Sequence, residues 1–347
     1  MKLWAVLPQY AQLKHPQALP RCESVRGKYA RSTRAVGSRT ASTHCLMGEG
    51  EKGEYCVSKL DCRTRLHYFE DNGMLDEVLS IIEQLRGGAK SRLHYAQIRE
   101  IMSAWAKDGV YQTYSIPAEL SVHRARRLEN KKWFEFVDDL GPPPPEKTIT
   151  YGRCHQPQHP LCYCSLYEDA ALAEVNAELG EHYVISTFTM PKDIRLIPVG
   201  ELDYFRRTGR TYIGHETPQS AKPYEEALRE NDWHVTALID AFLADEFIKP
   251  AITQMDYKIT SALSDVLLNG DLNPRTPIDA IVYPSVVFRE GINFAILPEP
   301  YKSKMKLVEA DTKIMKISDV LGYGIFKVRL LASLKSVSSD GRLKWEA

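Results

Sequence analysis

The sequence predicts an α+β protein in which a small helical region precedes a larger domain of strands and helices. Apolar residues repeat at helical spacing over residues 74–85, and a second helical pattern follows over residues 95–107. Beyond Pro117 the pattern changes to short apolar strands separated by loops. With 347 residues, of which 44% are hydrophobic, the chain is long enough for one large domain or two unequal ones.

We expect four parts along the chain: a basic extension at residues 1–61, a helical N-terminal region at 62–116, the main domain at 117–330 and a C-terminal tail at 331–347. The first 46 residues contain eight Lys and Arg residues against one acid, Glu23, and they have no hydrophobic period. A targeting peptide has this composition. We interpret the segment as a disordered extension, or as an over-long start with Met47 as the initiator.

Sequence patterns predict individual helices and strands in the helical N-terminal region and in the main domain. The helix at residues 74–85 has Asp71 or Asn72 in place to cap its start, residues 86–92 interrupt it, and the second helix ends at Gly109. Further strands are predicted at residues 120–126, 182–190, 194–199, 278–286 and 292–298, and further helices at 223–247 and 257–268. The last two strands are almost continuously apolar, so we expect them in the centre of the sheet.

The balanced charge of the chain argues against partners that bind through a strong overall electrostatic field. Lys and Arg number 45, as do Asp and Glu, so no net charge favours nucleic acid or an anionic membrane. No apolar run is long enough to span a membrane. Seven cysteines, an odd number, indicate reduced thiols. We therefore expect a soluble cytoplasmic protein without a direct nucleic-acid or membrane partner, and we leave homo-oligomer formation open.

The segment of residues 151–175 places three chemically useful side chains in one strand–turn–helix unit: Arg153, Tyr163 and Glu174. Strand alternation puts Tyr163 on one face, with Leu161 and Ser165, and puts the neighbouring cysteines on the other.

Those cysteines, Cys162 and Cys164, are predicted to be small buried hydrophobic residues. A zinc site is the alternative, but the CYC sequence lacks the two-residue gap of a chelating loop. We therefore predict no metal site.

Periodicity alone gives Glu174 an ordinary structural role. It lies away from the apolar stripe formed by Leu172, Val175 and Leu179 on the helical wheel. Charged residues without partners are rarely buried, so this pattern predicts a solvent-exposed glutamate.

The other candidates also have structural interpretations. Arg124 and Arg126 alternate along a strand and are typical of a basic strand edge that resists aggregation. Ser285 is typical of a serine at the end of a strand. The sequence has no phosphate-binding P-loop, GxGxxG or GxSxG motif, so these patterns do not support NTPase, Rossmann or serine-hydrolase functions.

The order of the pieces, however, resembles the RES domain over roughly residues 117–300. The matching pieces are Arg124, Gly152-Arg153, Tyr163 within PLCYCS, Glu174 within AALAEV, Thr260 within YKIT and Ser285 within IVYPSV. The chain departs from the family at two places: Cys154-His155 stands where a small polar residue, often asparagine, follows the Gly-Arg turn, and Gln158-His159 replaces the glycine before the strand.

The resemblance implies a fold similar to ADP-ribosyltransferases, with NAD as a substrate and no prosthetic group. It implies Arg124, Glu174 and Ser285 as catalytic residues, and Arg124, Arg126, Arg153, Tyr163 and Ser285 as NAD-binding residues. These residue types suit the chemistry of NAD. Arginine binds diphosphate through paired hydrogen bonds, an aromatic ring attracts the cationic nicotinamide, and a carboxylate stabilises positive charge that develops on the ribose.

The expected activity is cleavage of the nicotinamide–ribose bond by an NAD glycohydrolase or phosphorylase. Many proteins of this family resemble toxins paired with a helix-turn-helix antitoxin. Two alternatives stay open from the sequence: an ADP-ribosyltransferase that modifies a macromolecule, and a non-enzymatic module that binds a nucleotide or a protein partner.

Overall fold

The computed structural model describes residues 73–86, 93–109, 111–116, 119–212, 218–269, 277–288 and 291–347. Within them, helices combine with a mixed β-sheet, so the predicted α+β class is confirmed. The predicted basic extension and the candidate cap residues Asp71 and Asn72 lie outside the described residues.

The helices Gly73–Gln84, Tyr95–Asp108 and Lys258–Leu268 lie close to the predicted ranges, whereas Glu201–Thr208 and Pro298–Lys304 were not predicted. The described helices are α2 (Gly73–Gln84), α4 (Tyr95–Asp108), α5 (Glu168–Glu174), α6 (Glu201–Thr208), α7 (Pro218–Ala227), α8 (Trp233–Ile248), α9 (Lys258–Leu268) and α10 (Pro298–Lys304). The single helix predicted over residues 223–247 was wrong, because α7 and α8 are separate. Asn231 and Asp232 lie between them, and such residues favour caps and turns over helix interiors.

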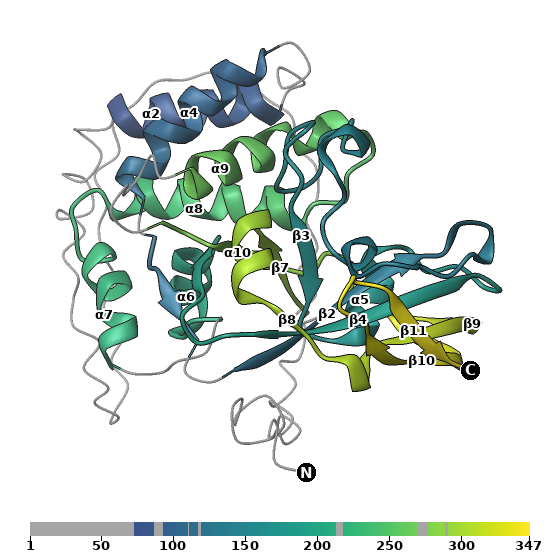
Figure 1. The fold of residues 1–347 in the computed structure, drawn as a ribbon. Helices are drawn as coiled ribbons and strands as arrows, with labels where there is room; N and C mark the ends of the chain where they lie inside the picture. Colours follow the sequence, from purple (N-terminus) through teal and green to yellow (C-terminus); the bar gives the residue numbers. More distant parts are fainter. Residues whose placement is uncertain are drawn as a thin grey trace, which may run out of the picture. The chain divides into compact units, whose positions relative to one another are not determined.

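The two N-terminal helices are part of the domain core. Residues one turn apart on α4, such as Ile98 and Met102, are fully buried, because residues four apart share a helix face. Helix α4 packs against α9, and α2 packs against α8. Figure 1 shows these helices stacked together beside the sheet.

The described strands form one mixed sheet. They are β1 (Tyr114–Ser115), β2 (Leu120–Arg127), β3 (Cys162–Ser165), β4 (His182–Met190), β5 (Arg195–Pro198), β6 (Ala280–Pro284), β7 (Ile292–Ile296), β8 (Lys306–Leu307), β9 (Lys313–Gly322), β10 (Ile325–Val337) and β11 (Leu343–Glu346). The order is β1-β5-β6-β7-β3-β2-β4-β9-β10-β11, with β8 pairing to β4. Strands β6 and β7 have strands on both sides, which confirms the central position that their apolar sequences predicted.

The sheet opens between β2 and β3. These strands pair through one residue pair only, His123 with Ser165. On its other edge β2 pairs with β4 over its whole length, from Leu120 with Met190 to Arg127 with Tyr183. Strands β2 and β3 therefore separate on either side of one contact, and side chains occupy the space where backbone hydrogen bonds would otherwise form.

Residues 331–347 are not a tail, so that prediction was wrong. The second half of β10 and all of β11 belong to the sheet and pair with each other antiparallel. Ala332, Leu334 and Leu343 are buried in the same core cluster as residues of β2, β3 and β4. The burial of these residues anchors the end of the domain.

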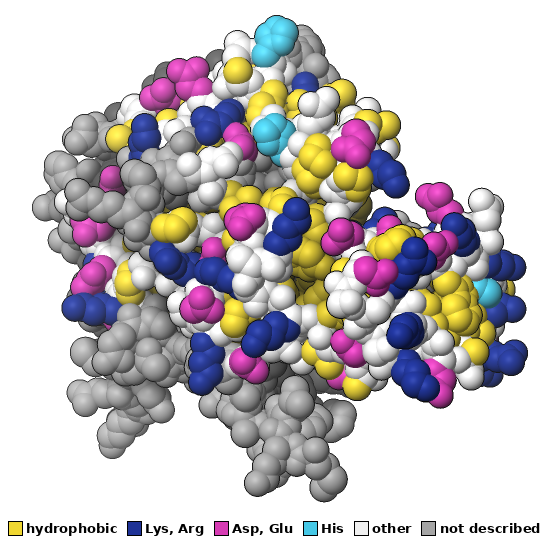
Figure 2. Space-filling model, in the orientation of Figure 1, with side chains coloured by type: hydrophobic (Ala, Val, Ile, Leu, Met, Phe, Trp, Pro, Cys, Tyr) yellow, Lys and Arg dark blue, Asp and Glu magenta, His cyan; other side chains and the backbone are white. Residues whose placement is uncertain are grey.

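Opposite charges are interspersed over the visible face of the molecule, in keeping with the zero formal net charge of the chain (Figure 2). Among the residues that the structure describes, no helix combines the length and the apolar character needed to cross a membrane.

Candidate functional site

A cavity of about 500 Å³ lies where β2 and β3 separate. It is bordered by all of the predicted site residues except Ser285. The residues around it are His123, Arg124, Ala125, Arg126, Arg127, Arg153, Tyr163, Cys164, Ser165, Ala171, Glu174, Val175, Tyr257, Tyr283 and Asn293. The opening in the sheet therefore brings together side chains that lie far apart in the sequence.

Glu174 is the last residue of α5 and is held by one of its two carboxylate oxygens. Ser285 Oγ and Asn293 Nδ2 both donate to Glu174 Oε1, each at 2.6 Å. Ser165 Oγ donates in turn to Asn293 Oδ1 at 2.6 Å and so fixes the orientation of the amide. No described residue makes a hydrogen bond to Oε2. One oxygen thus positions the carboxylate, and the other can accept further hydrogen bonds.

Periodicity alone predicted that Glu174 is solvent-exposed. This prediction was wrong, because Glu174 is half-buried. Helix α5 has only seven residues and ends at Glu174. Val175 and Leu179, which defined the supposed apolar stripe, lie beyond that end and are 39% and 64% exposed. The helical wheel was drawn past the end of the real helix, so it placed Val175 and Leu179 on a buried face that does not exist there.

Ser285 follows β6 directly and organises the loop to β7. Its Oγ donates to Glu174 and also accepts the main-chain N–H of Phe288 at 3.0 Å. The main-chain N–H of Ser285 donates to the oxygen of Gly291 at 2.8 Å. With its hydroxyl engaged both as donor and as acceptor, Ser285 positions the Glu174 carboxylate.

Arg124 bridges the opening between the two strands. Its Nη1 donates to the main-chain oxygen of Tyr163 at 2.9 Å. Its Nε is buried and has no hydrogen-bond partner among the described residues. No hydrogen bond to a described residue involves Nη2, so this nitrogen can bind an anionic group in the cavity.

The other two predicted arginines are engaged by the protein itself. Arg126 Nη1 donates to the main-chain oxygen of Asp139, and its guanidinium lies 4.9 Å from the centre of the Phe134 ring. Burial, with nearby Arg124 as a second cause, lowers the pKa of Arg126. This arginine can shape the edge of the cavity, but part of its hydrogen-bonding capacity is already used.

Arg153 caps the C-terminal end of α8. Its Nη1 donates to the main-chain oxygen of Phe247 at 2.5 Å, with longer contacts to the oxygens of Glu246 and Lys249 at 3.4 Å. Its guanidinium lies 5.2 Å from the centre of the Tyr257 ring. A cation at this position complements the negative end of the helix, so Arg153 ties the Gly-Arg turn to α8.

Tyr163 faces the cavity from β3, on the strand face that alternation predicted. It packs with Leu161 against one core cluster, whereas Cys162 and Cys164 are buried in another. The two cysteines are free thiols, as their interpretation as core residues requires. Burial raises the pKa of Tyr163 well above its ordinary value, so its hydroxyl keeps its proton at neutral pH.

Sequence reasoning missed Asn293, Tyr257 and Tyr283. Asn293 is 2% exposed within a strand of apolar residues, and a lone amide in such a strand is the signal that could have identified it. Tyr257 lies at the start of α9, three residues before Thr260 of the YKIT piece. Thr260 itself is buried and donates to the main-chain oxygen of Tyr257 at 3.2 Å, so it supports the tyrosine rather than bordering the cavity.

Both departures from the RES pattern lie in the turn before β3. Gln158 has a φ of 66°, in the left-handed region that glycine adopts without steric cost. Cys154 is buried, and burial raises the pKa of its thiol to about 12. It is therefore not a reactive thiol. No set of three His, Cys, Asp or Glu side chains among the described residues could hold a metal ion.

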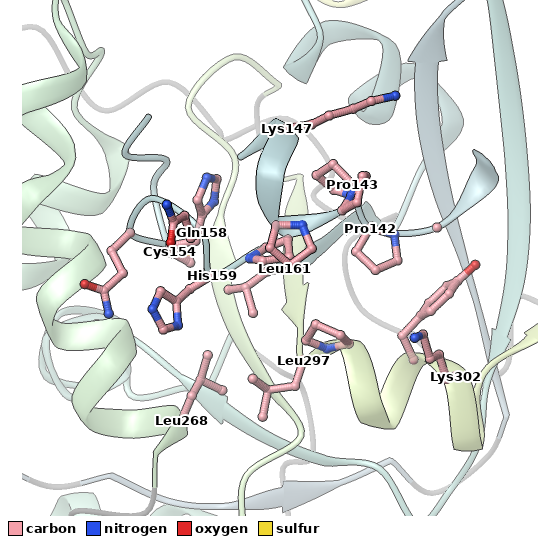
Figure 3. A pocket seen from close by; sticks show the side chains of 18 of the residues that line it. Pro142, Pro143, Lys147, Cys154, Gln158, His159, Leu161, Leu268, Leu297 and Lys302 are labelled. Atoms are coloured by element: carbon pink, nitrogen blue, oxygen red, sulfur yellow. The ribbon is translucent and has the colours of Figure 1, made fainter. Parts of the chain in front are cut away.

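A second cavity of about 640 Å³ is bordered by residues of this turn, among them Gln158 and His159 (Figure 3). Cys154 borders it, whereas the adjacent Arg153 borders the cavity that contains Glu174. Its walls include Pro142, Leu161 and Leu297, and none of the six predicted site residues. Five of the six predicted site residues therefore border the cavity between β2 and β3, and none borders the second one.

Comparison with known proteins identifies the family of the chain. The model of the RES domain family matches residues 121–312, which is more than half of the chain and includes all six predicted site residues. No curated protein matches the chain. On the extent of the family match, this chain belongs to the RES domain family.

Proposed function

We propose that the protein is an NAD-consuming enzyme that cleaves the bond between nicotinamide and ribose. The RES family is associated with enzymes that act on NAD. The observation that carries the proposal is the state of Glu174: Ser285 and Asn293 hold one carboxylate oxygen, and no described residue hydrogen-bonds to the other. A carboxylate held in this way is oriented in advance to meet a cation.

The chemistry of NAD suits a single carboxylate. The ribosyl nitrogen of nicotinamide is positively charged, and nicotinamide leaves as a neutral molecule, so the bond breaks without a general acid. Positive charge moves to the ribose, as in the oxocarbenium-like transition states of glycosidases. Glu174 Oε2 would accept a hydrogen bond from a ribose hydroxyl and stabilise that charge. One such preorganised contact typically contributes about 10² to 10³ in rate.

The remaining residues around the cavity suit the other parts of NAD. Arg124 Nη2 would bind the diphosphate through a charge-assisted hydrogen bond. The tyrosine rings of Tyr163 and Tyr257 would contact the cationic nicotinamide, since an aromatic face attracts a cation. Arg126 and Arg153 contribute positive potential beside the diphosphate, although their direct hydrogen bonds go mainly to the protein.

The proposal also extends to a biological role. Depletion of NAD would stop growth, so we propose that the protein acts in the cytoplasm as a toxin or stress effector. A helix-turn-helix antitoxin is the proposed partner. Growth of cells that express the chain, with and without the Glu174→Ala substitution, tests this role: the wild type should arrest growth and the variant should not.

The direct test is incubation of the purified chain with NAD labelled in its ADP-ribose part. Wild type should release nicotinamide, Glu174→Ala should not, and Glu225→Ala on the exposed surface of α7 should behave as wild type. The position of the label identifies the acceptor: free ADP-ribose means water, a phosphorylated product means phosphate, and label on a macromolecule means an ADP-ribosyltransferase. No release at any enzyme concentration would leave only a binding function.

A further inference from the structure

The hydroxyl end of Tyr163 is fixed inside the turn that carries Arg153, and His155 is one of the two residues that fix it. The main-chain N–H of Cys154 donates to Tyr163 Oη at 2.9 Å, and Oη lies 2.8 Å from His155 Nδ1. The centres of the His155 and Tyr163 rings are 5.6 Å apart. The Cys154 N–H can only donate, so Tyr163 Oη accepts there. Among the described residues His155 Nδ1 is the one nitrogen or oxygen acceptor within hydrogen-bond reach of the hydroxyl hydrogen, so the hydroxyl donates to the imidazole.

This direction requires a neutral imidazole with its hydrogen on Nε2. Burial lowers the pKa of His155 to about 4, and a hydrogen bond with the backbone of Thr150 acts in the opposite direction. The ring is therefore neutral at neutral pH. Its Nδ1 accepts from Tyr163, and its Nε2–H is available to the Thr150 backbone.

The turn is shaped around the imidazole. Gly152 and His155 exchange main-chain hydrogen bonds of 2.9 and 3.4 Å. A Cβ atom on Gly152 would lie 2.1 Å from His155 Cε1, so the ring occupies the space that a side chain at position 152 would need. His155 does not border the cavity that contains Glu174. Its imidazole reaches that cavity through the contact with Tyr163, while His155 itself borders the second cavity.

The other end of Tyr163 is held from the opposite strand, since Arg124 Nη1 donates to its main-chain oxygen. We propose that His155 is a positioning residue that fixes the Tyr163 ring for ligand binding in the cavity between β2 and β3. The kinetic part of this inference rests on the proposed cleavage of NAD. The hydrogen bond from Tyr163 to His155 can be tested without it.

The first experiment observes the hydrogen bond by NMR of the full chain labelled with ¹⁵N-histidine. We expect His155 to be the Nε2–H tautomer at neutral pH, and Tyr163→Phe to shift the Nδ1 resonance of His155 but leave the exposed His159 unchanged. An Nδ1–H tautomer, or a His155 signal that Tyr163→Phe does not alter, would overturn the proposal whether or not the protein cleaves NAD.

The second experiment separates positioning from general stability. Asparagine can place an acceptor oxygen close to the position of Nδ1, whereas leucine cannot. We expect His155→Leu to raise KM for NAD about fivefold or more, the effect of losing one hydrogen bond, with kcat within about twofold because ground-state and transition-state binding weaken together. His155→Asn should restore KM to near the wild-type value.

Equal KM values in wild type and His155→Leu would overturn the positioning role, as would a defect that His155→Asn fails to relieve. If His155→Leu does not fold, the His155→Asn kinetics and the NMR signals still decide whether His155 fixes the Tyr163 ring. If wild type releases no nicotinamide, the proposed function fails, while the NMR result separately decides whether His155 holds Tyr163.

Discussion

Asn293 Nδ2 donates to Glu174 Oε1 at 2.6 Å, which joins the end of α5 to a strand 119 positions later in the chain. Ser285 reaches the same oxygen from the loop between β6 and β7. Two donors on one carboxylate oxygen leave a single orientation for the other oxygen. The geometry of the proposed site therefore depends on the central strands as much as on the segment that contains Glu174.

We predict that Ser285→Ala and Asn293→Ala each lower kcat for nicotinamide release by about 10-fold or more, since each removes one contact that orients the carboxylate. The double variant should lose less than the product of the two effects, because both donors act on the same oxygen. Ser303→Ala on the exposed side of α10 is the matched control. Fully multiplicative losses would mean that Ser285 and Asn293 act independently of each other, which would contradict a shared role on one oxygen.

Arg124→Lys should lower kcat/KM for NAD by about 10-fold to 100-fold. Lysine keeps the charge, but it cannot both bond the oxygen of Tyr163 and offer a second nitrogen to the diphosphate. Steady-state kinetics measures the loss, and Arg329→Lys on the exposed part of β10 should have no effect. Unchanged kinetics in Arg124→Lys would show that the bridge between β2 and β3 is not needed for substrate binding.

The N-terminal helices should be indispensable for folding. Met102 is fully buried between helices, so Met102→Ala should lower the free energy of unfolding by about 2 to 5 kcal/mol. Leu79 on α2 is 41% exposed, and Leu79→Ala should stay within about 0.5 kcal/mol of wild type. Denaturant unfolding measures both. A chain truncated before Pro117 that still folds would contradict this prediction.

Asp240 provides a test of pH dependence. Burial, with Asp203 and Glu201 nearby, raises its pKa to about 7, although the main-chain N–H of Asp203 donates to its Oδ2 at 2.7 Å. Between the unfolded pKa of about 3.9 and the folded pKa the folded state binds more protons, so this group's contribution to stability falls as pH rises through that window.

Asp240→Asn should remove this dependence of the unfolding free energy on pH, because asparagine does not titrate. The difference in unfolding free energy between wild type and Asp240→Asn should therefore decrease from pH 4 to pH 7 and stay level above it, as measured by denaturant unfolding at each pH. A difference that stays level from pH 4 to pH 7 would mean that the pKa of Asp240 is not raised in the folded protein.

Local patterns predicted α2, α4, α9 and the strands β2 to β7, because their apolar spacing repeats over several turns or residues. They failed where an element was short or interrupted, and they also missed the long strands β9 and β10, whose facing halves are mostly exposed. Helix α5 stops at Glu174, so a wheel drawn through Leu179 placed the glutamate on the wrong face. The end of β10 and β11 lack a strong pattern of their own and depend on pairing with each other.

The candidate site was predictable only in part for the same physical reason. Resemblance to the RES domain pointed to Arg124, Tyr163, Glu174 and Ser285, but a sequence does not show which side chains meet across a sheet. Asn293 became visible as a partner of Glu174 only when β7 was placed beside β3. The engagement of Arg153 by the end of α8 is likewise a contact between distant segments.

The central claim is that the charge on Glu174 stabilises the cation that forms as nicotinamide leaves. Glu174→Gln tests this claim most directly. The amide oxygen can still accept from Ser285 and Asn293, whereas the amide nitrogen that takes the place of Oε2 carries no negative charge. We predict that nicotinamide release at saturating NAD falls by about 10² or more, while the affinity for NAD measured by calorimetry changes by less than about threefold. Release at the wild-type rate in Glu174→Gln would contradict the account.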